Sequence, residues 1–559
     1  MKLKKYILLL LLSMLYLTII FFGVFFNYKV IENSKDININ NKNMATLVDC
    51  KGNFIVYNKK MYEAWIDLSF LRRQKKFKEY EHLLLSKYTQ DEIKDKKFLK
   101  WGKFYTKKEA EDNLGVLRKF SKIYETQDRI YNDLFSLSQL IGKYDKTNYG
   151  IEKYLYNNKL LETQKEQNLS IDLTLQRILY EELKKTVKEK NASGAVALIM
   201  NTKTGEIKAS VSIYPWNMGY MGYIEPGSTL KPMIYAMAID ENIIKPYETF
   251  KWSYQYTPKN TNIKIKESEY FDLGTMDIKT ALAHSSNVAI AKVMEKILNT
   301  YSQEWLYNSL LKMGFGKKTN IEFSGEIDGV LKNPDEWKSI TPYQIAIGQG
   351  IGVTPIQLIT AFNAIVNNGY YVYPTFFKNK KVFGRQIYSE RTSKKLLDWM
   401  RYTTILGTAK DAYKEGLLIG GKTGTAQKAL KGIGYTKEDY YSLFEGYYPS
   451  INPEYTFLII VDDPKGEYYG GEVAAPIITN VFYNYSKRKE VYNYLGYYFK
   501  GVLPNLINFD MEEAKALLIN LGYNFNKIII TGSGTKVTYQ YPNPGTLLKD
   551  TQYIELRSD

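Results

Sequence analysis

Cysteine and histidine are almost missing from this chain. Of its 559 residues, one is a cysteine, Cys50, and two are histidines, His82 and His284. A single cysteine excludes an internal disulfide framework and any CxxC metal or redox site. Two histidines leave little for a histidine-based zinc site or a Ser-His-Asp triad. We therefore expect no metal and no cofactor, and acid–base chemistry that depends on carboxylates, lysine, tyrosine or hydroxyl groups.

A concentrated basic segment is also missing. Lysine and arginine outnumber aspartate and glutamate by 76 to 59, which gives a net charge of +17. The lysines are scattered along the chain, so nucleic acid is not an expected partner. With 45% hydrophobic and 24% charged residues, the chain has the composition of a folded protein with sizeable cores. At roughly 150 residues per domain, its length predicts three or four domains.

One long apolar run does occur, over residues 7–26, and it contains no charged residue. At about 1.5 Å per residue it is long enough to span a bilayer core of roughly 30 Å. Lys2, Lys4 and Lys5 precede it, and no small-x-small cleavage site follows it. The sequence therefore predicts a cytoplasmic tail at 1–5 and an uncleaved membrane anchor at 6–26, with the rest of the chain outside the cytoplasmic membrane.

Downstream of the run, the texture of the sequence changes several times. Residues 27–165 are rich in Lys, Glu and Tyr and carry no catalytic signature. Residues 166–490 contain short apolar runs punctuated by glycine, which predict a mixed α/β domain. A strand is expected over residues 195–200, followed by a turn at Lys203-Thr204-Gly205. Residues 491–500 are interpreted as a linker, and residues 501–559 as a small separate module.

Three short motifs in a fixed order carry the chemistry. An S-x-x-K, an S-x-N and a K-T-G element together are typical of serine acyl-transfer sites with a lysine base. S-x-x-K starts at Ser228, Ser309, Ser486 and Ser533; S-x-N starts at Ser285 and Ser450; K-T-G starts at Lys203 and Lys422. The required order leaves one solution: Ser228, Ser285 and Lys422.

The residues around Ser228 support its interpretation as a nucleophile. A Pro226-Gly227 pair ends a loop, and an apolar helix is expected to follow, with Lys231 on the same face as Ser228. A lysine of ordinary pKa, about 10.4, is a poor base at neutral pH. Partial burial and a second cation nearby, for which Lys422 is the candidate, would lower the pKa of Lys231.

The K-T-G element lies in a predicted strand over residues 417–426. Strand alternation places Thr423 and Thr425 on one face, where their hydroxyls can hold a substrate carboxylate. Gly424 lets a ligand approach the backbone. The backbone amides of Ser228 and Thr425 are candidate donors to an oxyanion.

With these motifs, the whole chain resembles the class B penicillin-binding proteins, which are membrane-anchored D,D-transpeptidases that cross-link peptidoglycan. Further segments carry the likeness: Gly348-Gln349-Gly350, Val353-Thr354-Pro355-Ile356-Gln357, Phe444-Glu445-Gly446, Gly471-Glu472-Val473, Gly150-Ile151-Glu152 and Leu169-Ser170-Ile171-Asp172. Residues 501–559, with Gln540-Tyr541-Pro542-Asn543-Pro544-Gly545, are similar to a PASTA domain. The start of residues 27–165 departs from the family, because only Asp49 and Gly52 remain of its usual D-R-N-G element.

The resemblance implies a fold and a reaction. The expected fold is the mixed α/β transpeptidase fold, an antiparallel sheet flanked by helices plus a helical subdomain, with an α+β pedestal at 27–165 and a small α/β PASTA module. Ser228 would attack the penultimate D-Ala carbonyl of a stem peptide, and Lys231 would take its proton. Ser285 would relay a proton to the leaving amine, and Asn287 would bind the substrate backbone. Lys422, Thr423 and Thr425 would hold the terminal carboxylate.

The resemblance also implies partners and a location. Expected ligands are peptidoglycan stem peptides and β-lactams, and the membrane is contacted through residues 6–26. A membrane-embedded glycan polymerase and proteins of the division or elongation machinery are the expected protein partners. The protein would lie in the cytoplasmic membrane with its catalytic domain outside, and the single PASTA-like module favours a division or sporulation type.

Four different functions compete with this hypothesis. For an ATPase, Gly416 to Thr423 match a phosphate-loop pattern, but the residues between are too apolar to present amides to phosphate. A β-lactamase would use a Glu-x-x-Leu-Asn element well beyond the S-x-N motif. The pattern at 295–299 follows Asn287 too closely and is expected on the same helix, so we interpret it as a chance match. The remaining two are a β-lactam sensor on the same fold and a catalytically inactive wall-binding scaffold. Ser309, Lys312, His284 and Cys50 are expected to be structural.

Overall fold

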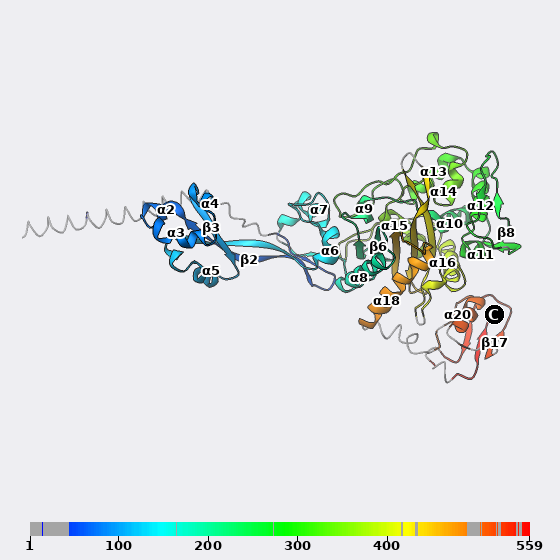
Figure 1. Cartoon of the computed structure of the whole chain (residues 1–559). Coiled ribbons are helices and arrows are strands. Elements are labelled where there is room, and N and C mark those ends of the chain that lie inside the picture. Colours follow the sequence, from blue (N-terminus) through cyan, green and yellow to red (C-terminus); the bar gives the residue numbers. More distant parts are fainter. Residues whose placement is uncertain are drawn as a thin grey trace, which may run out of the picture. The chain divides into compact units, whose positions relative to one another are not determined.

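The structure is a computed structural model, and it describes most of the chain beyond the N-terminal segment (Figure 1). The described residues are Met14, 44–488 except 164, 272, 415–416 and 431–433, and 503–559 except 505, 521–522, 524–526, 544–545 and 547–550. The predicted tail at 1–5, the predicted anchor at 6–26 apart from Met14, and the predicted linker at 491–500 lie outside them. Among the described helices, none is long and apolar enough to cross a membrane.

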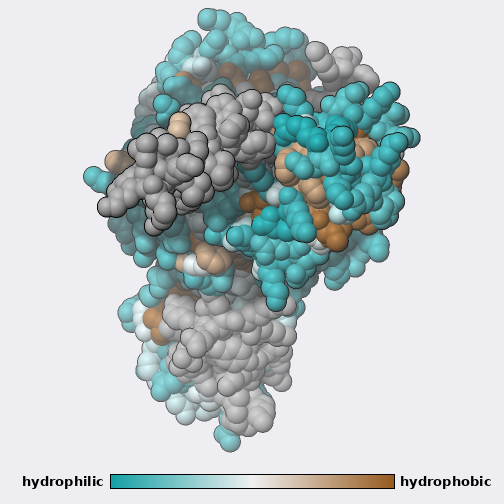
Figure 2. Space-filling view, turned by 90° about the vertical axis from the view of Figure 1, so that its left-hand side faces the viewer, coloured by the Kyte–Doolittle hydropathy of each residue, from teal (hydrophilic) through white to brown (hydrophobic). Residues whose placement is uncertain are grey.

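The described residues form two compact units. The smaller unit contains residues 44–46, 56–131 and 162–165, and the larger unit contains residues 47–55, 132–161 and 166–559. The domain boundaries predicted from the sequence stay predictions. The two units are defined by the packing within each of them, whereas the predicted boundaries were placed where the amino-acid composition changes. On the face seen in Figure 2, most of the described surface is hydrophilic and apolar residues form small patches.

The smaller unit contains three antiparallel strands of a five-stranded sheet, together with short helices. Strand β2 (Phe54–Asp67) pairs with β3 (Phe98–Phe104) on one side and β4 (Ser121–Tyr131) on the other. The helices are α2 (Leu68–Arg73), α3 (Phe77–Leu85), α4 (Gln90–Lys94), α5 (Lys107–Leu114) and the 3-10 helix η2 (Gly115–Phe120). Their apolar residues form one core that includes Ile66, Leu71 and Leu99.

The larger unit contains a five-stranded antiparallel sheet in the order β14-β15-β16-β6-β7. The strands are β6 (Gly194–Asn201), β7 (Ile207–Ser212), β14 (Gly420–Leu430), β15 (Gly434–Tyr448) and β16 (Tyr455–Asp462). Every residue of β16 is buried, as expected for a central strand with both faces covered. The mixed α/β fold with an antiparallel sheet flanked by helices, predicted from the sequence, is confirmed.

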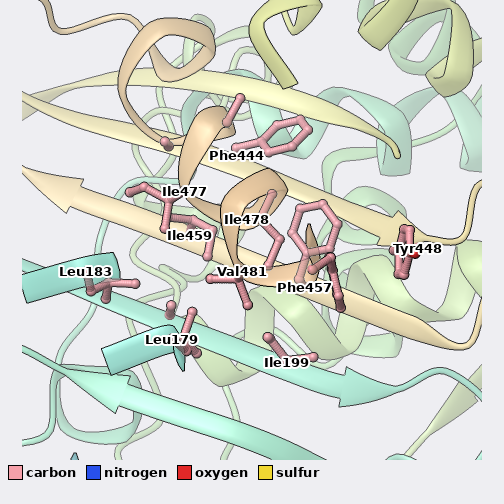
Figure 3. Packing of buried hydrophobic residues seen from close by; sticks show 14 of the residues in the cluster. Leu179, Leu183, Ile199, Phe444, Tyr448, Phe457, Ile459, Ile477, Ile478 and Val481 are labelled. Atoms are coloured by element: carbon pink, nitrogen blue, oxygen red, sulfur yellow. The ribbon is translucent and has the colours of Figure 1, made fainter. Parts of the chain in front are cut away.

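Helices cover both faces of this sheet. On one face, α8 (Leu173–Glu189) and α18 (Ala475–Arg488) pack an apolar core against the strands, in which Leu179, Phe457 and Val481 meet (Figure 3). On the other face lies α15 (Pro355–Val366), which is buried along its whole length. Thr354 starts this helix with a capping box, in which its hydroxyl accepts from the Gln357 amide at 3.2 Å.

A group of helices packs beside the sheet and carries two of the three motifs. They are α10 (Lys231–Asp240), α11 (Ile278–Ala283), α12 (Asn287–Thr300), α13 (Gln303–Lys312), α14 (Thr341–Ala346) and α16 (Glu390–Ile405). Helix α10 is apolar on all sides and nearly wholly buried, so it is a core helix that fixes its first residue firmly. Ser309 and Lys312, which were expected from the sequence to be structural, lie on α13.

Shorter elements connect these layers. They are β1 (Leu47–Val48), α6 (Leu134–Ile141), α7 (Ile151–Asn157), η3 (Leu161–Thr163), β5 (Gln167–Asn168), α9 (Met218–Met221), η4 (Gly227–Leu230), β8 (Thr249–Lys251), β9 (Gln255–Tyr256), β10 (Ile265–Lys266), β11 (Thr275–Asp277), η5 (Pro334–Glu336), β12 (Tyr370–Val372), β13 (Gly384–Gln386), η6 (Lys410–Ala412) and α17 (Gly470–Val473). The C-terminal module contains α20 (Met511–Asn520) and a sheet of β17 (Ile528–Thr531), β19 (Ile554–Arg557) and β18 (Tyr539–Tyr541), in that order.

Candidate active site

The candidate nucleophile Ser228 lies in a single 3-10 turn, η4, immediately before α10. The residue before it, Gly227, has a φ of +55° and donates its N–H to Gly348 O at 2.9 Å. A Cβ added at Gly348 would lie 1.9 Å from Gly227 O, so only glycine fits there. The glycine of the Gly348-Gln349-Gly350 segment therefore holds the turn that carries Ser228.

Lys231 is the first residue of α10 and is completely buried. Its Nζ donates to Ser285 O at 2.5 Å and to Asn287 Oδ1 at 2.7 Å, and lies 3.3 Å from Ser285 Oγ. Burial lowers the pKa of Lys231 to about 7, against the opposing attraction of the Glu267 carboxylate. A substantial fraction of Lys231 is therefore neutral near pH 7, as a proton acceptor has to be.

Ser285 lies between α11 and α12 in a left-handed conformation with a φ of +58°. Such a backbone conformation costs free energy in a residue other than glycine, and it is often found at functional sites. The next residue, Ser286, caps α12 by accepting from the Ala289 amide at 3.0 Å. This cap fixes the S-x-N element, so that the Ser285 hydroxyl and the Asn287 amide group both reach Lys231.

Lys422 reaches the same serine from the sheet. It lies on β14, is completely buried, and donates its Nζ to Ser285 Oγ at 2.8 Å and to Thr423 O at 2.8 Å. Burial lowers the pKa of Lys422, and repulsion by Lys231 lowers it further. The sequence interpretation gave Lys422 the task of lowering the pKa of Lys231. In the structure burial is the main cause for both lysines, and the repulsion between them acts on Lys422.

The motif residues line one cleft with a volume of about 430 Å³. The residues of the three motifs in its lining are Ser228, Ser285, Asn287, Thr423, Gly424 and Thr425. Thr423 Oγ1 is hydrogen-bonded to Thr408 Oγ1 at 2.6 Å, and Thr425 Oγ1 accepts from the Gly470 amide at 3.3 Å. A larger cavity, of about 1250 Å³, is lined by Asp240 and Ser389 among others and contains no residue of the motifs at Ser228, Ser285 and Lys422. The smaller cleft is therefore the candidate site.

Two details of the cleft differ from the sequence interpretation. A Cβ at Gly424 would lie 2.9 Å from Thr229 Cγ2, so the packing of β14 on η4 requires the glycine, a reason that the sequence interpretation did not give. In the described part of the chain, Lys231 Nζ is held by Ser285 and Asn287, and no hydrogen bond joins it to the Ser228 hydroxyl. Catalytic hydrogen bonds often tighten only when substrate is bound.

Two buried carboxyl groups beside the lysines were missed in the sequence. Glu267 accepts hydrogen bonds from Ser286 Oγ and from the amides of Asn287 and Val288. Glu445 lies opposite Lys422 in the β14–β15 pairing. Nothing in the sequence marks Glu267, which precedes the S-x-N motif by 18 residues (285 − 267). For Glu445, the signal was a charged residue in an otherwise apolar strand segment.

The residues that the sequence set aside have other partners. Glu295 lies on α12, as expected, and accepts from Tyr256 Oη at 2.6 Å and from the Lys259 amide at 3.0 Å. His284 stacks on Phe271 with ring centroids 5.1 Å apart, but it also lines the cleft. Gly416, which starts the phosphate-loop pattern, lies outside the described residues. Within the described residues, no cluster of His, Cys, Asp and Glu could hold a metal ion.

Comparisons with known proteins show which family the chain belongs to. The family described as the penicillin binding protein transpeptidase domain matches residues 195–483, and the PASTA domain matches residues 501–559. The chain is 28% identical over 436 residues to Stage V sporulation protein D of Bacillus subtilis, covering 70% of this chain and 65% of that protein. It is 32% identical over 359 residues to peptidoglycan D,D-transpeptidase FtsI of Buchnera aphidicola, covering 61% of each. The chain thus matches less than two thirds of the length of these two relatives.

A solved structure is similar as well. The TP domain of penicillin-binding protein 3 from Burkholderia pseudomallei matches with a TM-score of 0.53 and 27% identity. The match covers 58% of this chain and 96% of that domain. The likeness in fold therefore extends over almost the whole of that domain.

Proposed function

Because the chain belongs to the penicillin-binding protein transpeptidase family, we propose that it is a serine-type D,D-transpeptidase that cross-links peptidoglycan stem peptides. The relative named peptidoglycan D,D-transpeptidase FtsI supports this activity. The observation that carries the proposal is the meeting of two buried lysines on one serine. Lys231 Nζ and Lys422 Nζ both lie within hydrogen-bond distance of Ser285 Oγ, in the cleft that Ser228 also lines.

The first half of the reaction forms an acyl-enzyme. Ser228 Oγ attacks the carbonyl carbon of the penultimate D-Ala, and its proton passes to neutral Lys231. The amides of Ser228 and Thr425 donate to the negative carbonyl oxygen. When the peptide C–N bond breaks, Ser285 relays the proton from Lys231 to the leaving nitrogen, and the last D-Ala leaves with an amino group. The contacts of Ser285 with both lysines support this relay.

Substrate binding uses the other residues of the cleft. The carboxylate of the terminal D-Ala would be held by the hydroxyls of Thr423 and Thr425 and by the charge of Lys422. Asn287 contacts Lys231 with its Oδ1, and it would also hydrogen-bond the substrate backbone. Binding the carboxylate at β14 would place the scissile carbonyl next to Ser228, because η4 packs against β14.

The second half of the reaction releases the enzyme. The amine of a neighbouring stem peptide attacks the ester carbonyl, a new amide bond forms, and the bond to Ser228 Oγ breaks. The amine proton returns through Lys231 to the serine oxygen. A β-lactam would acylate Ser228 in the same way, but its leaving nitrogen would stay tethered to the adduct, so the ester would persist.

The location and the partners of the protein follow from the sequence and the family. The apolar run at 7–26 supports a single-pass anchor in the cytoplasmic membrane, with the catalytic domain outside. Residues 27–165 would form the pedestal, and residues 501–559 a PASTA domain. A membrane-embedded glycan polymerase and proteins of the division or elongation machinery are the proposed partners.

The proposal is tested by acylation with a fluorescent penicillin, followed over hours on the full-length protein in detergent. We expect a stable adduct that is lost in Ser228→Ala. Ser309→Ala, which removes the serine of an S-x-x-K pattern on α13, is the matched control and should be labelled like the unaltered protein. Rapid loss of the adduct would instead indicate a β-lactamase. No adduct and no release of D-Ala from a pentapeptide would indicate an inactive scaffold.

A further inference from the structure

Glu445 is a completely buried carboxyl group that the proposed mechanism does not use. It lies on β15, directly opposite Lys422 on β14, and opposite Leu458 on β16. Residues directly opposite each other on paired antiparallel strands point to the same face of the sheet. Neither oxygen of the Glu445 carboxyl group has a hydrogen-bond partner among the described residues.

Such a group is unusual in a protein interior. Buried polar side chains are nearly always hydrogen-bonded, because leaving one without a partner loses the hydrogen bonds that water would make to it. The neighbours of Glu445 along β15, Phe444 and Leu443, are buried and apolar. An apolar residue of similar size would therefore suit the position better if packing alone decided it. The carboxyl group needs another explanation.

Few ionisable groups lie near Glu445 and Lys422. Lys231, on α10, is the other charge that acts on Lys422. Helix α15, which covers this face of the sheet, has no charged residue. On α16, which packs against β14, Arg401 is paired with Asp398 at 2.7 Å. Tyr447, on β15, donates its hydroxyl to Leu397 O.

Two further ionisable groups, Tyr235 and Glu267, lie near Lys231. The negative charge of Glu267, which lies just beyond β10, raises the pKa of the buried Tyr235 phenol on α10 and the pKa of the Lys231 amine. No comparable influence of Glu267 on Lys422 is found. Each buried lysine thus has one buried carboxyl group of its own: Glu267 for Lys231 and Glu445 for Lys422.

The electrostatics of the pair are coupled. Burial raises the pKa of Glu445, and the positive charge of Lys422 opposes that rise. Burial lowers the pKa of Lys422, and the negative charge of Glu445 opposes that fall. A neutral carboxyl beside a neutral amine and a carboxylate beside an ammonium ion have the same net charge and the same number of protons. The pair therefore passes from one form to the other without adding charge to the interior.

We propose that Glu445 is a positioning residue that acts through Lys422, as the buried counter-charge that lets Lys422 be an ammonium ion where the substrate carboxylate binds. The inference rests on the proposed function, which gives Lys422 that ligand. When the carboxylate enters, the proton shared by the pair resides on Lys422 Nζ, and Glu445 becomes a carboxylate. Without Glu445, protonation of Lys422 would place a positive charge in the protein interior beside Lys231, and Lys422 would have no buried carboxylate of its own to balance it.

The pH profile of acylation tests this inference. The second-order rate constant for labelling by a fluorescent penicillin is measured from about pH 5 to about pH 10. Its fall at alkaline pH reports the loss of the proton from Lys422. In Glu445→Gln the counter-charge is gone, the pKa of Lys422 falls, and we expect the alkaline limb to move to lower pH by about one unit or more.

Two further variants separate this role from a structural one. Glu445→Leu should move the alkaline limb as Glu445→Gln does, although it restores apolar packing and should not lower the melting temperature. Leu443→Met, a change of similar volume two residues along the same strand, is the matched control and should leave the limb in place. A penicillin methyl ester, which lacks the carboxylate, should be labelled with little difference between Glu445→Gln and the unaltered protein.

The possible outcomes distinguish this inference from the proposed function. If the unaltered protein is not acylated at any pH, the proposed function fails and takes the inference with it. If it is acylated and the alkaline limb of both Glu445 variants coincides with its own, the proposed function stands and the counter-charge inference is overturned. A lower rate constant at every pH with an alkaline limb in the same place would also overturn it, because that result would mean that Glu445 contributes only to the packing of the site.

Discussion

The two walls of the cleft bury the same pair of residue types in different ways. In the helical wall, formed by α10 and α12, Glu267 acts on Lys231 and accepts three hydrogen bonds from Ser286, Asn287 and Val288. In the strand wall, formed by β14 and β15, Glu445 acts on Lys422 and has no hydrogen-bond partner among the described residues. The carboxyl group of Glu267 is therefore held by hydrogen bonds within the fold, and the carboxyl group of Glu445 is not.

This difference shows how the surroundings of a buried lysine can suit it either to accept a proton or to bind an anionic ligand. Glu267 accepts hydrogen bonds from amides at the N-terminus of α12, where a helix favours negative charge, so the position of its carboxyl group beside Lys231 is fixed by the fold. Glu445 has no such donors, and its charge follows that of Lys422. That arrangement suits a lysine whose charge is needed when an anionic ligand arrives.

Removal of each lysine is expected to give the largest difference between the walls. Lys231→Met removes the proposed proton acceptor, and general-base catalysis contributes about 10² to 10⁴ in rate, so we expect a loss of acylation in that range. Lys422→Met removes a charged contact to the ligand carboxylate, worth about 1.5 to 3 kcal/mol, which corresponds to a loss of roughly 10- to 150-fold. Second-order rate constants for penicillin acylation measure both.

The control for these two variants is Lys312→Met, which removes the lysine of the S-x-x-K pattern on α13 and should leave the rate unchanged. An equal loss in both cleft variants, with a methyl-ester penicillin as well as with the acid, would contradict the division of tasks. Both lysines would then serve the chemical step, and neither would belong mainly to binding.

The acid limb of the pH profile should sharpen the comparison. Lys231 accepts a proton only when neutral, and burial lowers its pKa to about 7, so the rate should fall about tenfold per pH unit below that value. Glu267 raises the pKa of Lys231. Glu267→Gln should therefore lower that pKa and move the acid limb to lower pH, while the alkaline limb stays in place.

Glu445→Gln should do the reverse, with a moved alkaline limb and an unchanged acid limb. Acylation rates of the two variants, measured with one penicillin over the same pH range, give the result. If both variants move the same limb, the two carboxyl groups act on one shared charge, and the assignment of one to each lysine is wrong.

The order of three short motifs predicted where the helical wall and the strand wall would meet. Ser285 Oγ does lie between Lys231 and Lys422, although 137 residues separate Ser285 from Lys422 in the sequence. The motif order is informative because each motif occupies a fixed position in the fold. The fold then brings the three motifs together, although they are far apart in the sequence. The strand over 195–200 and the helix after Ser228 were predictable for a simpler reason, since each is a continuous apolar run bounded by glycine or proline.

The two carboxyl groups were not predictable in the same way. Glu267 comes to Lys231 through a loop without regular periodicity, so nothing in the sequence sets the distance between them. Glu445 depends on the register of β14 and β15, which pairs Lys422 with it. A shift by one residue would have turned Glu445 to the other face of the sheet. Register depends on packing across the sheet, which the sequence of one strand does not show.

Stability is expected to show the smallest effect, but with opposite signs in the two walls. Glu267→Gln leaves one carbonyl oxygen for three donors, and a buried donor without a partner costs about 1 to 3 kcal/mol, so the free energy of unfolding should fall by about that amount. Glu445→Leu removes a buried carboxyl group that has no hydrogen-bond partner among the described residues and adds an apolar contact with Leu458, so it should raise the free energy of unfolding by about 1 kcal/mol. Thermal and urea unfolding of the full-length protein at neutral pH measure both. A loss of stability in Glu445→Leu would mean that this carboxyl group is stabilised within the strand wall after all, and the contrast between the two walls would disappear.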